Sequence, residues 1–215
     1  MAEIITIPVG ALEVNCYIVW DADTLEGVII DPGADAAEIE AAVRKEGILV
    51  KCVINTHGHF DHVGADGVMK AAFGAPVSIH PKDAALMADA HEHGIFFGVN
   101  TPQQSEPDIL LEDGQVIEFG PLKLKVIHTP GHTRGGVCLY MEDGKVLFTG
   151  DTLFAGSVGR TDFEGGSMED LMSSITGRLL PLGDEVRVLP GHGPESTIGE
   201  EREINPFLAG MKKVK

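Results

Sequence analysis

The stretch INTHGHFDHVG (residues 54–64) constrains this chain more than any other part of it. It places His57, His59, Asp61 and His62 within six positions, directly after the apolar run CVI. Imidazole and carboxylate groups are costly to bury without partners, so such a cluster behind a strand needs a ligand. In an extended segment, residues two apart point the same way, so the first two histidines can bind one ion together. The stretch therefore predicts a metal-binding loop at the end of a strand.

The remaining sequence alternates strand-like runs with helical patterns. Strands are expected over residues 3–9, 15–21, 27–33, 51–55, 77–80, 114–119, 122–129, 135–141, 145–151 and 185–191. Helices are expected over residues 34–47, 63–73, 81–90 and 167–180, and from near Ile198. Residues 91–107 have no sustained period and contain two prolines and two glycines, so they are expected to form a long loop.

Two segments of the chain echo each other. KCVINTHGH and LKLKVIHTPGHT each read as a strand that runs into a loop bearing histidine. Two such β/α halves packed face to face would bring both loops to one sheet edge, with the two sheets inside and the helices outside. With 43% hydrophobic residues, the 215-residue chain can bury a sizeable core. We expect an α/β fold in one domain over residues 1–215.

Three further strand ends carry candidate ligands beside glycine. They are His132, Asp151 and His192. With the first loop this makes seven imidazoles and carboxylates, a donor set that suits two divalent cations such as Zn²⁺ with positions left for water. His57, His59 and His132 are expected at the first ion, Asp61, His62 and His192 at the second, and Asp151 between them. Ions in two-metal sites lie ~3.5–4 Å apart.

Other histidines and the cysteines have simpler interpretations. His91 and His93 form a second HxH pair, but no strand precedes them, so we expect surface side chains. His80 and His128 end strands and are expected either to support ligands or to be buried and hydrogen-bonded. The three cysteines, Cys16, Cys52 and Cys138, lie in apolar runs and are expected to be buried thiols, which suits a reducing compartment.

Charge and hydropathy narrow the class of partner. The formal net charge of −17 argues against nucleic acid and anionic membrane surfaces, which require clustered cations. No run approaches the ~20 apolar residues of a membrane span, and no signal-peptide pattern opens the chain. We expect a small-molecule substrate and a cytoplasmic protein, and the sequence leaves the oligomeric state open.

The motifs THGHFDHVG, HTPGHT, GDTLF and LPGHGP, in this order, resemble the metallo-β-lactamase superfamily, and specifically its glyoxalase II-like hydrolases. The resemblance implies an αββα sandwich, with two mixed β-sheets flanked by helices, and a binuclear metal site. Its ligands map onto the same seven residues, with Asp151 bridging. Zinc is the expected metal, with iron and manganese as alternatives.

Two departures from glyoxalase II bear on the substrate. Those enzymes carry a helical C-terminal region that supplies cations to glutathione, whereas few residues follow His192 here. In the stretch GDTLFAGSVGRTDFEGG, Arg160 takes the place of a lysine and Asp162 that of a common tyrosine. This Gly-Arg-Thr-Asp form resembles short bacterial glyoxalase II-like proteins and the persulfide dioxygenases.

The resemblance and the ligand set together predict a thioester hydrolase. A metal-bridging hydroxide, oriented by the expected catalytic residues Asp61 and Asp151, would cleave a thioester such as S-lactoylglutathione to a hydroxy acid and a thiol. Arg160 is expected to bind the substrate carboxylate, and the alternative for it is a surface pair with Asp162 or Glu164.

Rival functions remain open. A persulfide dioxygenase would hold one Fe²⁺ by His57, His132 and Asp151, but the complete second ligand set favours two metals. A non-catalytic metal-binding scaffold ranks last. β-Lactam hydrolysis is not expected, because that branch is usually secreted.

Overall fold

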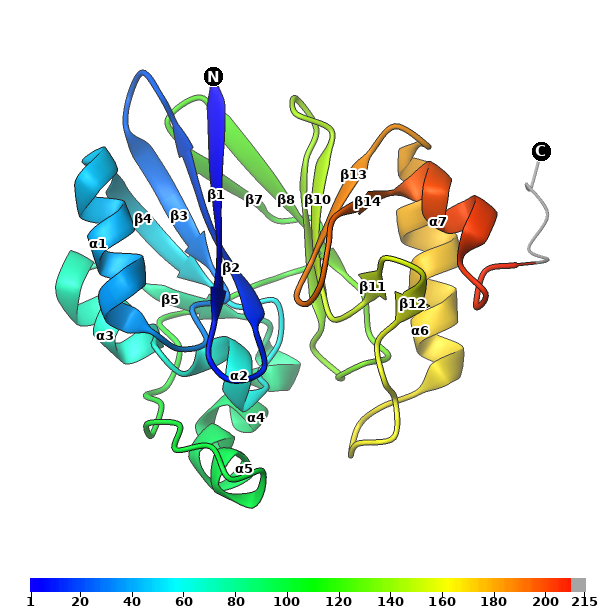
Figure 1. The fold of residues 1–215 in the computed structure, drawn as a ribbon, viewed down its shortest axis with the longest axis horizontal. Coiled ribbons are helices and arrows are strands. Elements are labelled where there is room, and N and C mark those ends of the chain that lie inside the picture. Colours follow the sequence, from blue (N-terminus) through cyan, green and yellow to red (C-terminus); the bar gives the residue numbers. More distant parts are fainter. Residues whose placement is uncertain (210–215) are drawn as a thin grey trace.

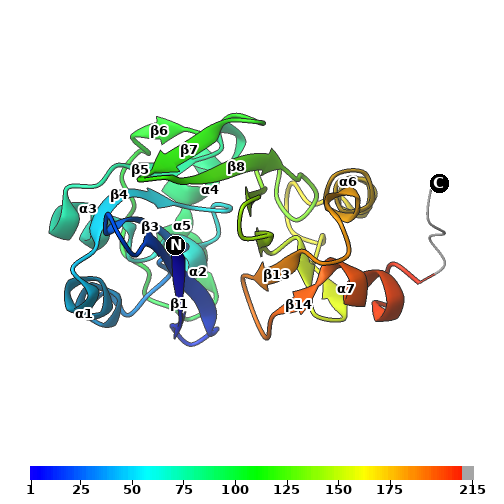
Figure 2. The same cartoon turned by 90° about the horizontal axis from the view of Figure 1, so that it is seen from above.

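The computed structural model describes residues 1–209, and within them two six-stranded sheets face each other. Helices cover the outer face of each sheet, and the sheets form the middle of the molecule (Figure 1). Figure 2, turned by 90°, shows α1 (Ala36–Glu46) and α3 (Asp66–Phe73) on one side and α6 (Met168–Ser174) and α7 (Ile198–Ile204) on the other. This arrangement confirms the predicted αββα sandwich.

The first sheet begins as the predicted meander and continues with parallel strands. β1, β2 and β3 pair antiparallel, and β3, β4, β5 and β6 pair parallel. The strands, in sheet order, are β1 (Ala2–Val9), β2 (Val14–Asp21), β3 (Glu26–Ile30), β4 (Leu49–Ile54), β5 (Val77–Ile79) and β6 (Ile109–Leu110).

The second sheet is mostly antiparallel, with one parallel pair between β10 and β13. Its strands, in sheet order, are β14 (Ser196–Thr197), β13 (Arg187–Pro190), β10 (Val146–Gly150), β9 (Val137–Met141), β8 (Leu122–His128) and β7 (Val116–Phe119). A small hairpin of β11 (Leu153–Phe154) and β12 (Ser157–Val158) follows β10. Both sheets are therefore mixed.

The core forms three layers, because side chains alternate along the buried strands. On β2, Ile18 faces the helices α1 and α3, whereas Val19 faces the second sheet. On the far side of the second sheet, Leu147 packs with Leu171 of α6. All three cysteines are buried and free, as predicted.

Several predicted elements differ from the structure. The expected loop over residues 91–107 begins with a helix, α5 (Ala90–Phe96), so His91 and His93 are helical. The expected helix over 63–73 is two helices, α2 (Phe60–Val63) and α3. The expected helix over 81–90 is a 3-10 turn followed by α4 (Ala84–Ala88). The expected helix over 167–180 begins as α6 and continues as a π-helical turn.

No helix within residues 1–209 is long and apolar enough to cross a membrane.

Candidate metal centre

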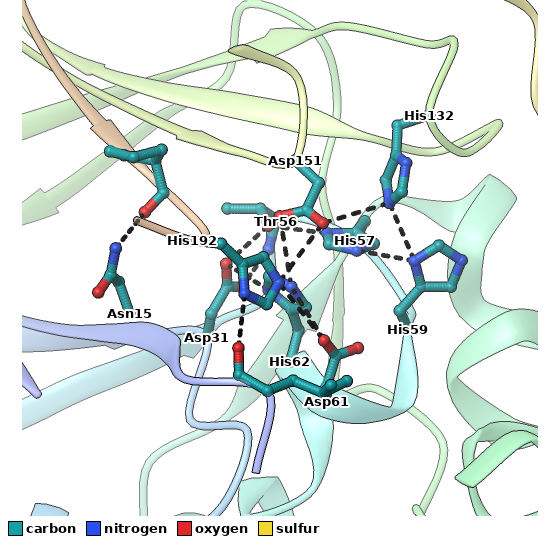
Figure 3. A network of polar contacts seen from close by, with 12 residues as sticks. Asn15, Asp31, Thr56, His57, His59, Asp61, His62, His132, Asp151 and His192 are labelled. Atoms are coloured by element: carbon teal, nitrogen blue, oxygen red, sulfur yellow. Dashed lines mark hydrogen bonds and ion pairs between the residues drawn. The ribbon is translucent and has the colours of Figure 1, made fainter. Parts of the chain in front are cut away.

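The loops at the ends of four strands bring all seven predicted ligands together (Figure 3). His57 and His59 lie in the loop after β4, and Asp61 and His62 lie on the short helix α2 that follows. The second sheet supplies the other three ligands: His132 after β8, Asp151 after β10 and His192 after β13. Each sheet therefore contributes only part of the cluster.

The first three predicted ligands form a compact triplet of ring nitrogens. Nδ1 of His59 lies 3.0 Å from Nε2 of His57 and 3.0 Å from Nε2 of His132. The three donor atoms lie within 4.8 Å of one another, a spacing at which one ion can contact all three.

A second triplet consists of Asp61, His62 and His192, whose donor atoms also lie within 4.8 Å of one another. Asp151 lies between the two triplets (Figure 3). One of its carboxylate oxygens, Oδ2, is 3.6 Å from Nε2 of both His132 and His192, and Oδ1 is 3.5 Å from Nε2 of His62. The arrangement could hold two cations that share this carboxylate.

Hydrogen bonds on the outer side of the cluster set the tautomers of three histidines. Nδ1 of His62 donates to the carboxylate of Asp31 at 3.0 Å. Nδ1 of His132 donates to the carbonyl of Arg160 at 2.7 Å, and Nδ1 of His192 donates to that of Leu12 at 2.9 Å. A neutral imidazole has one N–H, so when these rings are neutral the Nε2 atom is the one whose lone pair can bind a cation in the cluster.

Thr56 fixes the tautomer of His57 in a similar way. Its hydroxyl donates to Asp31 Oδ2 at 2.7 Å, and its backbone N–H donates to Oδ1 of the same carboxylate at 2.7 Å. The hydroxyl has no second proton, so it accepts from Nδ1 of His57 at 3.1 Å, which leaves Nε2 of that ring as a lone pair.

The sequence interpretation missed Asp31, which is buried and orients His57 and His62. The sequence did contain a signal for this residue. Like Asp151, Asp31 directly follows a strand, here β3. Unlike Asp151, it stands before a Pro-Gly pair. The Pro-Gly pair reads as an ordinary turn, which hid the carboxylate.

Asp83 was also missed, and it ties the two histidine loops together. Its carboxylate accepts from the Gly58 N–H at 3.1 Å, from the Thr133 hydroxyl at 2.6 Å and from the Gly135 N–H at 2.6 Å. Burial raises the pKa of Asp83, and these three donors oppose that rise. The residue therefore holds the loop after β4 against the loop after β8.

The electrostatics of the cluster suit cations. Burial, together with His132, lowers the pKa of His59 to about 3, and burial lowers the pKa of His57 well below its ordinary value, so both rings stay neutral. Burial alone would raise the pKa of Asp61, but His62 and His192 outweigh burial and lower this pKa below its ordinary value. The carboxylate therefore stays ionised.

Two buried atoms inside the cluster have no hydrogen-bond partner among residues 1–209: Nε2 of His62 and Oδ1 of Asp151. Orphaned buried groups are costly. Cations between the triplets would give both atoms a partner, so the residues present fit a binuclear divalent metal site.

Close backbone approach makes the cluster possible at Gly33 and Gly191. A Cβ atom on Gly33 would lie 1.5 Å from the carbonyl oxygen of Asp61. A Cβ atom on Gly191 would lie 2.3 Å from Oδ1 of Asp151. Any larger residue at either position would displace a ligand.

The cluster lies at the floor of a pocket of about 880 Å³. Aromatic rings form one wall: Phe60 stacks on Phe97 at 5.5 Å, Phe97 meets Phe163 at 5.9 Å, and Phe163 meets His59 at 5.7 Å. The pocket therefore joins an apolar wall to a polar floor, as small-molecule sites do.

The remaining predicted residues lie around this pocket or outside it. Arg160 lines the pocket, but its guanidinium makes a two-pronged pair with the carboxylate of Asp162 at 2.6 and 2.7 Å. His93 also lines the pocket, from α5, whereas Nδ1 of His91 donates to the Thr101 carbonyl at 2.6 Å. His80 and His128 stack on each other, with centroids 4.2 Å apart.

Comparison with known proteins places this geometry in a family. The profile of the metallo-beta-lactamase superfamily matches residues 9–192. The chain is 39% identical to the hydroxyacylglutathione hydrolase GloC of Haemophilus influenzae, over 94% of this chain and 96% of that protein. It is 32% identical to a mitochondrial persulfide dioxygenase of Bos taurus, over 89% of this chain and 70% of that protein.

Two solved structures are closely similar. The crystal structure of the B3 metallo-beta-lactamase BLEG-1 superposes with a TM-score of 0.91 at 37% identity, covering 97% of this chain and all of that one. TTHA1623 in a di-iron-bound form superposes with a TM-score of 0.88 at 39% identity, covering 95% of this chain and all of that one.

Proposed function

Because the chain belongs to the metallo-beta-lactamase superfamily, we propose that it is a binuclear metal-dependent hydrolase of the glyoxalase II type. Its substrate is a thioester such as S-lactoylglutathione, which it cleaves to a hydroxy acid and a thiol. The observation that carries this proposal is the pair of complete donor triplets that share Asp151. The similarity to GloC supports the choice of a thioester.

The residues of the chain have distinct roles in this reaction. Two bound divalent cations would supply a Lewis acid for the thioester carbonyl and bring the pKa of a water close to neutrality. His57, His59 and His132 would hold one cation, and Asp61, His62 and His192 would hold the other. Asp151 and Asp61 face the space between the triplets, where their carboxylates can accept hydrogen bonds from the attacking water and aim it.

The surroundings of the site support the same chemistry. Asp31 and Thr56 fix the rings of His57 and His62, so the ligands need little reorganisation during the reaction. The aromatic wall beside His59 can cover the acyl group and exclude bulk water from the carbonyl. None of the three cysteines, all within residues 1–209, is placed to act as a nucleophile, since each is buried and burial raises the pKa of each thiol.

We propose zinc as the metal, because borderline nitrogen and oxygen donors in these numbers suit it. The di-iron form of TTHA1623 supports iron as the alternative. Arg160 stays a prediction as the group that binds the substrate carboxylate, since its guanidinium must first leave Asp162.

A persulfide dioxygenase is the second candidate, favoured by the similarity to the bovine enzyme. One experiment separates the two. Zinc-loaded and iron-loaded protein are incubated with S-lactoylglutathione under argon and in air, and iron-loaded protein with glutathione persulfide in an oxygen electrode. The proposal expects equal thioester cleavage with and without oxygen, because water is the only co-substrate.

Two results would contradict the proposal of a thioester hydrolase. One is stoichiometric oxygen uptake with persulfide and no thioester turnover under argon, which assigns the chain to the dioxygenase class. The other is turnover of a chromogenic cephalosporin without thioester cleavage, which assigns it with the B3 lactamase. His57→Ala protein is the matched control in each arm.

A further inference from the structure

Two cationic side chains on the wall of the pocket, Lys82 and Arg134, have no ion-pair partner within residues 1–209. Both are exposed. Arg160, by contrast, is held by both oxygens of Asp162 and packs over the ring of Phe163 at 3.8 Å. In a chain of net charge −17, cations left free inside a ligand pocket are candidates for binding an anionic group.

The backbone holds these two residues beside each other by two separate ties. The first is the buried carboxylate of Asp83, which directly follows Lys82. It accepts from the Thr133 hydroxyl and from the Gly135 N–H, each at 2.6 Å. Arg134 therefore lies between the two residues that Asp83 binds.

The second tie is the stacked pair of His80 and His128, whose rings lie 4.2 Å apart and 6° from parallel. The backbone N–H of Lys82 donates to Nδ1 of His80 at 3.3 Å. Nε2 of His128 donates to the backbone carbonyl of Arg134 at 3.0 Å. His80 and His128, neither of which is a metal ligand, thus fix the backbones of the two free cations.

The side chain of Arg134 is also aligned by packing. A Cβ atom at Gly165 would lie 3.1 Å from Cγ and 3.2 Å from Nε of Arg134, so the aliphatic stem lies against that glycine. Gly165 belongs to the same loop as Phe163 of the aromatic wall. The stem of Arg134 therefore packs against the loop whose Phe163 contacts His59, and Arg134 lines the pocket.

We propose that Lys82 and Arg134 form an anion-binding subsite for the thiol half of the substrate, while the thioester carbonyl lies at the metal centre. The anion is a carboxylate or a phosphate, because both accept two charge-assisted hydrogen bonds from a guanidinium. Asp89 and Glu164 line the same pocket, so the positive charge is local and suits a discrete anionic group. The identity of the ligand as a thiol derivative rests on the proposed function.

Binding of non-hydrolysable thioethers tests this inference without turnover. Metal-loaded protein is titrated calorimetrically with S-hexylglutathione, which carries carboxylates, and with S-hexyl-coenzyme A, which carries phosphates. The diethyl ester of S-hexylglutathione, which keeps the ammonium group but has no carboxylate, is the counterpart without an anionic group. We expect Lys82→Ala and Arg134→Ala each to raise Kd for one anionic probe by about ten-fold, typical of a lost charge-assisted contact. Kd for the diethyl ester should stay the same.

Controls separate charge recognition from damage to the fold. Arg44→Ala removes an exposed arginine on α1 that pairs with Glu40, and should leave all three Kd values unchanged. Arg134→Lys should recover part of the affinity that Arg134→Ala loses. The probe that responds identifies the anion as carboxylate or phosphate.

Three results would overturn the inference: wild-type protein that binds neither anionic probe, variants that bind them as wild type does, and equal weakening of the diethyl ester. Failure of the proposed function looks different. In that case S-lactoylglutathione is not cleaved, yet anionic probes still depend on Lys82 and Arg134.

Discussion

His57 and His93 offer a direct test of the two HxH pairs at the scale of single residues. His57 is buried in the first triplet, whereas His93 lies on α5 and reaches only the pocket. We expect wild-type protein to bind close to two zinc ions per chain, His57→Ala to lose activity and one ion, and His93→Ala to keep both. Metal per chain is measured by elemental analysis after dialysis. Loss of metal only in His93→Ala protein would mean that the metal centre is not the cluster around His57.

Asp31 should control the affinity of the metal site although it binds no ion itself. In Asp31→Asn protein an amide N–H would face the donors of Thr56 or His62, so at least one of these contacts is lost. Losing such an outer partner typically weakens metal binding by about 10–100-fold. Competition with a chromophoric chelator measures the change.

Asp35→Asn is the matched control, because this residue accepts from the Gly10 N–H, away from the cluster. Equal zinc affinity of Asp31→Asn and wild-type protein would show that the outer carboxylate does not matter.

The ligands were predictable from the sequence because they are local. His57 to His62 form one contiguous motif, and His132 and His192 each follow a strand beside glycine. Asp31 and Asp83 were not predictable in the same way, since their partners lie 25 to 52 positions away in the chain. Their role depends on which loops the fold brings together.

At the scale of elements, the contact of Gly33 with α2 sets the position of two ligands. The carbonyl of Asp61 occupies the space that a side chain at Gly33 would need. Gly33→Ala must push α2 away, and we expect this to cost about 3 kcal/mol, or a fall of about 10 °C in Tm, together with loss of the second ion. Thermal melting and metal analysis measure both effects.

Gly67→Ala is the control for this change, because Gly67 lies in α3 and a methyl group at that position would have no atom within 4 Å. There alanine should raise stability by about 0.5–1 kcal/mol through its helix preference. A Gly33→Ala protein as stable as wild type would mean that the loop adapts without moving α2.

Asp66, the first residue of α3, should make stability depend on pH. Burial raises its pKa well above the ordinary value, and Asn55 donates to it at 2.6 Å. A raised pKa means that the folded state holds the proton more tightly, so this contribution is full at acid pH and is lost as pH rises. Asp66→Asn removes the titration, so its Tm relative to wild type should be higher at pH 8 than at pH 5. A constant difference between the two pH values would refute this explanation.

Elements with strong periodic patterns were predicted well, and short or irregular ones were not. The run of alanines and isoleucine predicted the helix α1, and the β-branched run predicted the strand β2. α5 was missed because glycine and adjacent phenylalanines at its end read as a loop. β6 and β14 have two residues each, too few to show any alternation.

At the scale of the whole molecule, the ligands come from both sheets, so bound ions would join the two halves. We expect a chelator to lower Tm by about 10 °C, because a ligand present at ~1,000 times its Kd stabilises the folded state by about 4 kcal/mol. Calorimetric scans with and without chelator measure this shift. His57→Ala protein should respond less, and an equal response in both would contradict the arrangement.

The two-sheet architecture followed from the sequence echo between the two strands whose following loops bear His57 and His132. The pocket did not follow from it, because its wall combines Phe97 and Phe163, which lie in separate irregular segments. Long-range packing of this kind has no periodic signal.

The division of the ligands between the sheets also sets an order of events during synthesis. A growing chain contains His57, His59, Asp61 and His62 long before it contains Asp151 or His192. Neither triplet with its shared carboxylate can form until the second sheet is made. The complete metal centre can therefore form only near the end of synthesis, once His192 has been added.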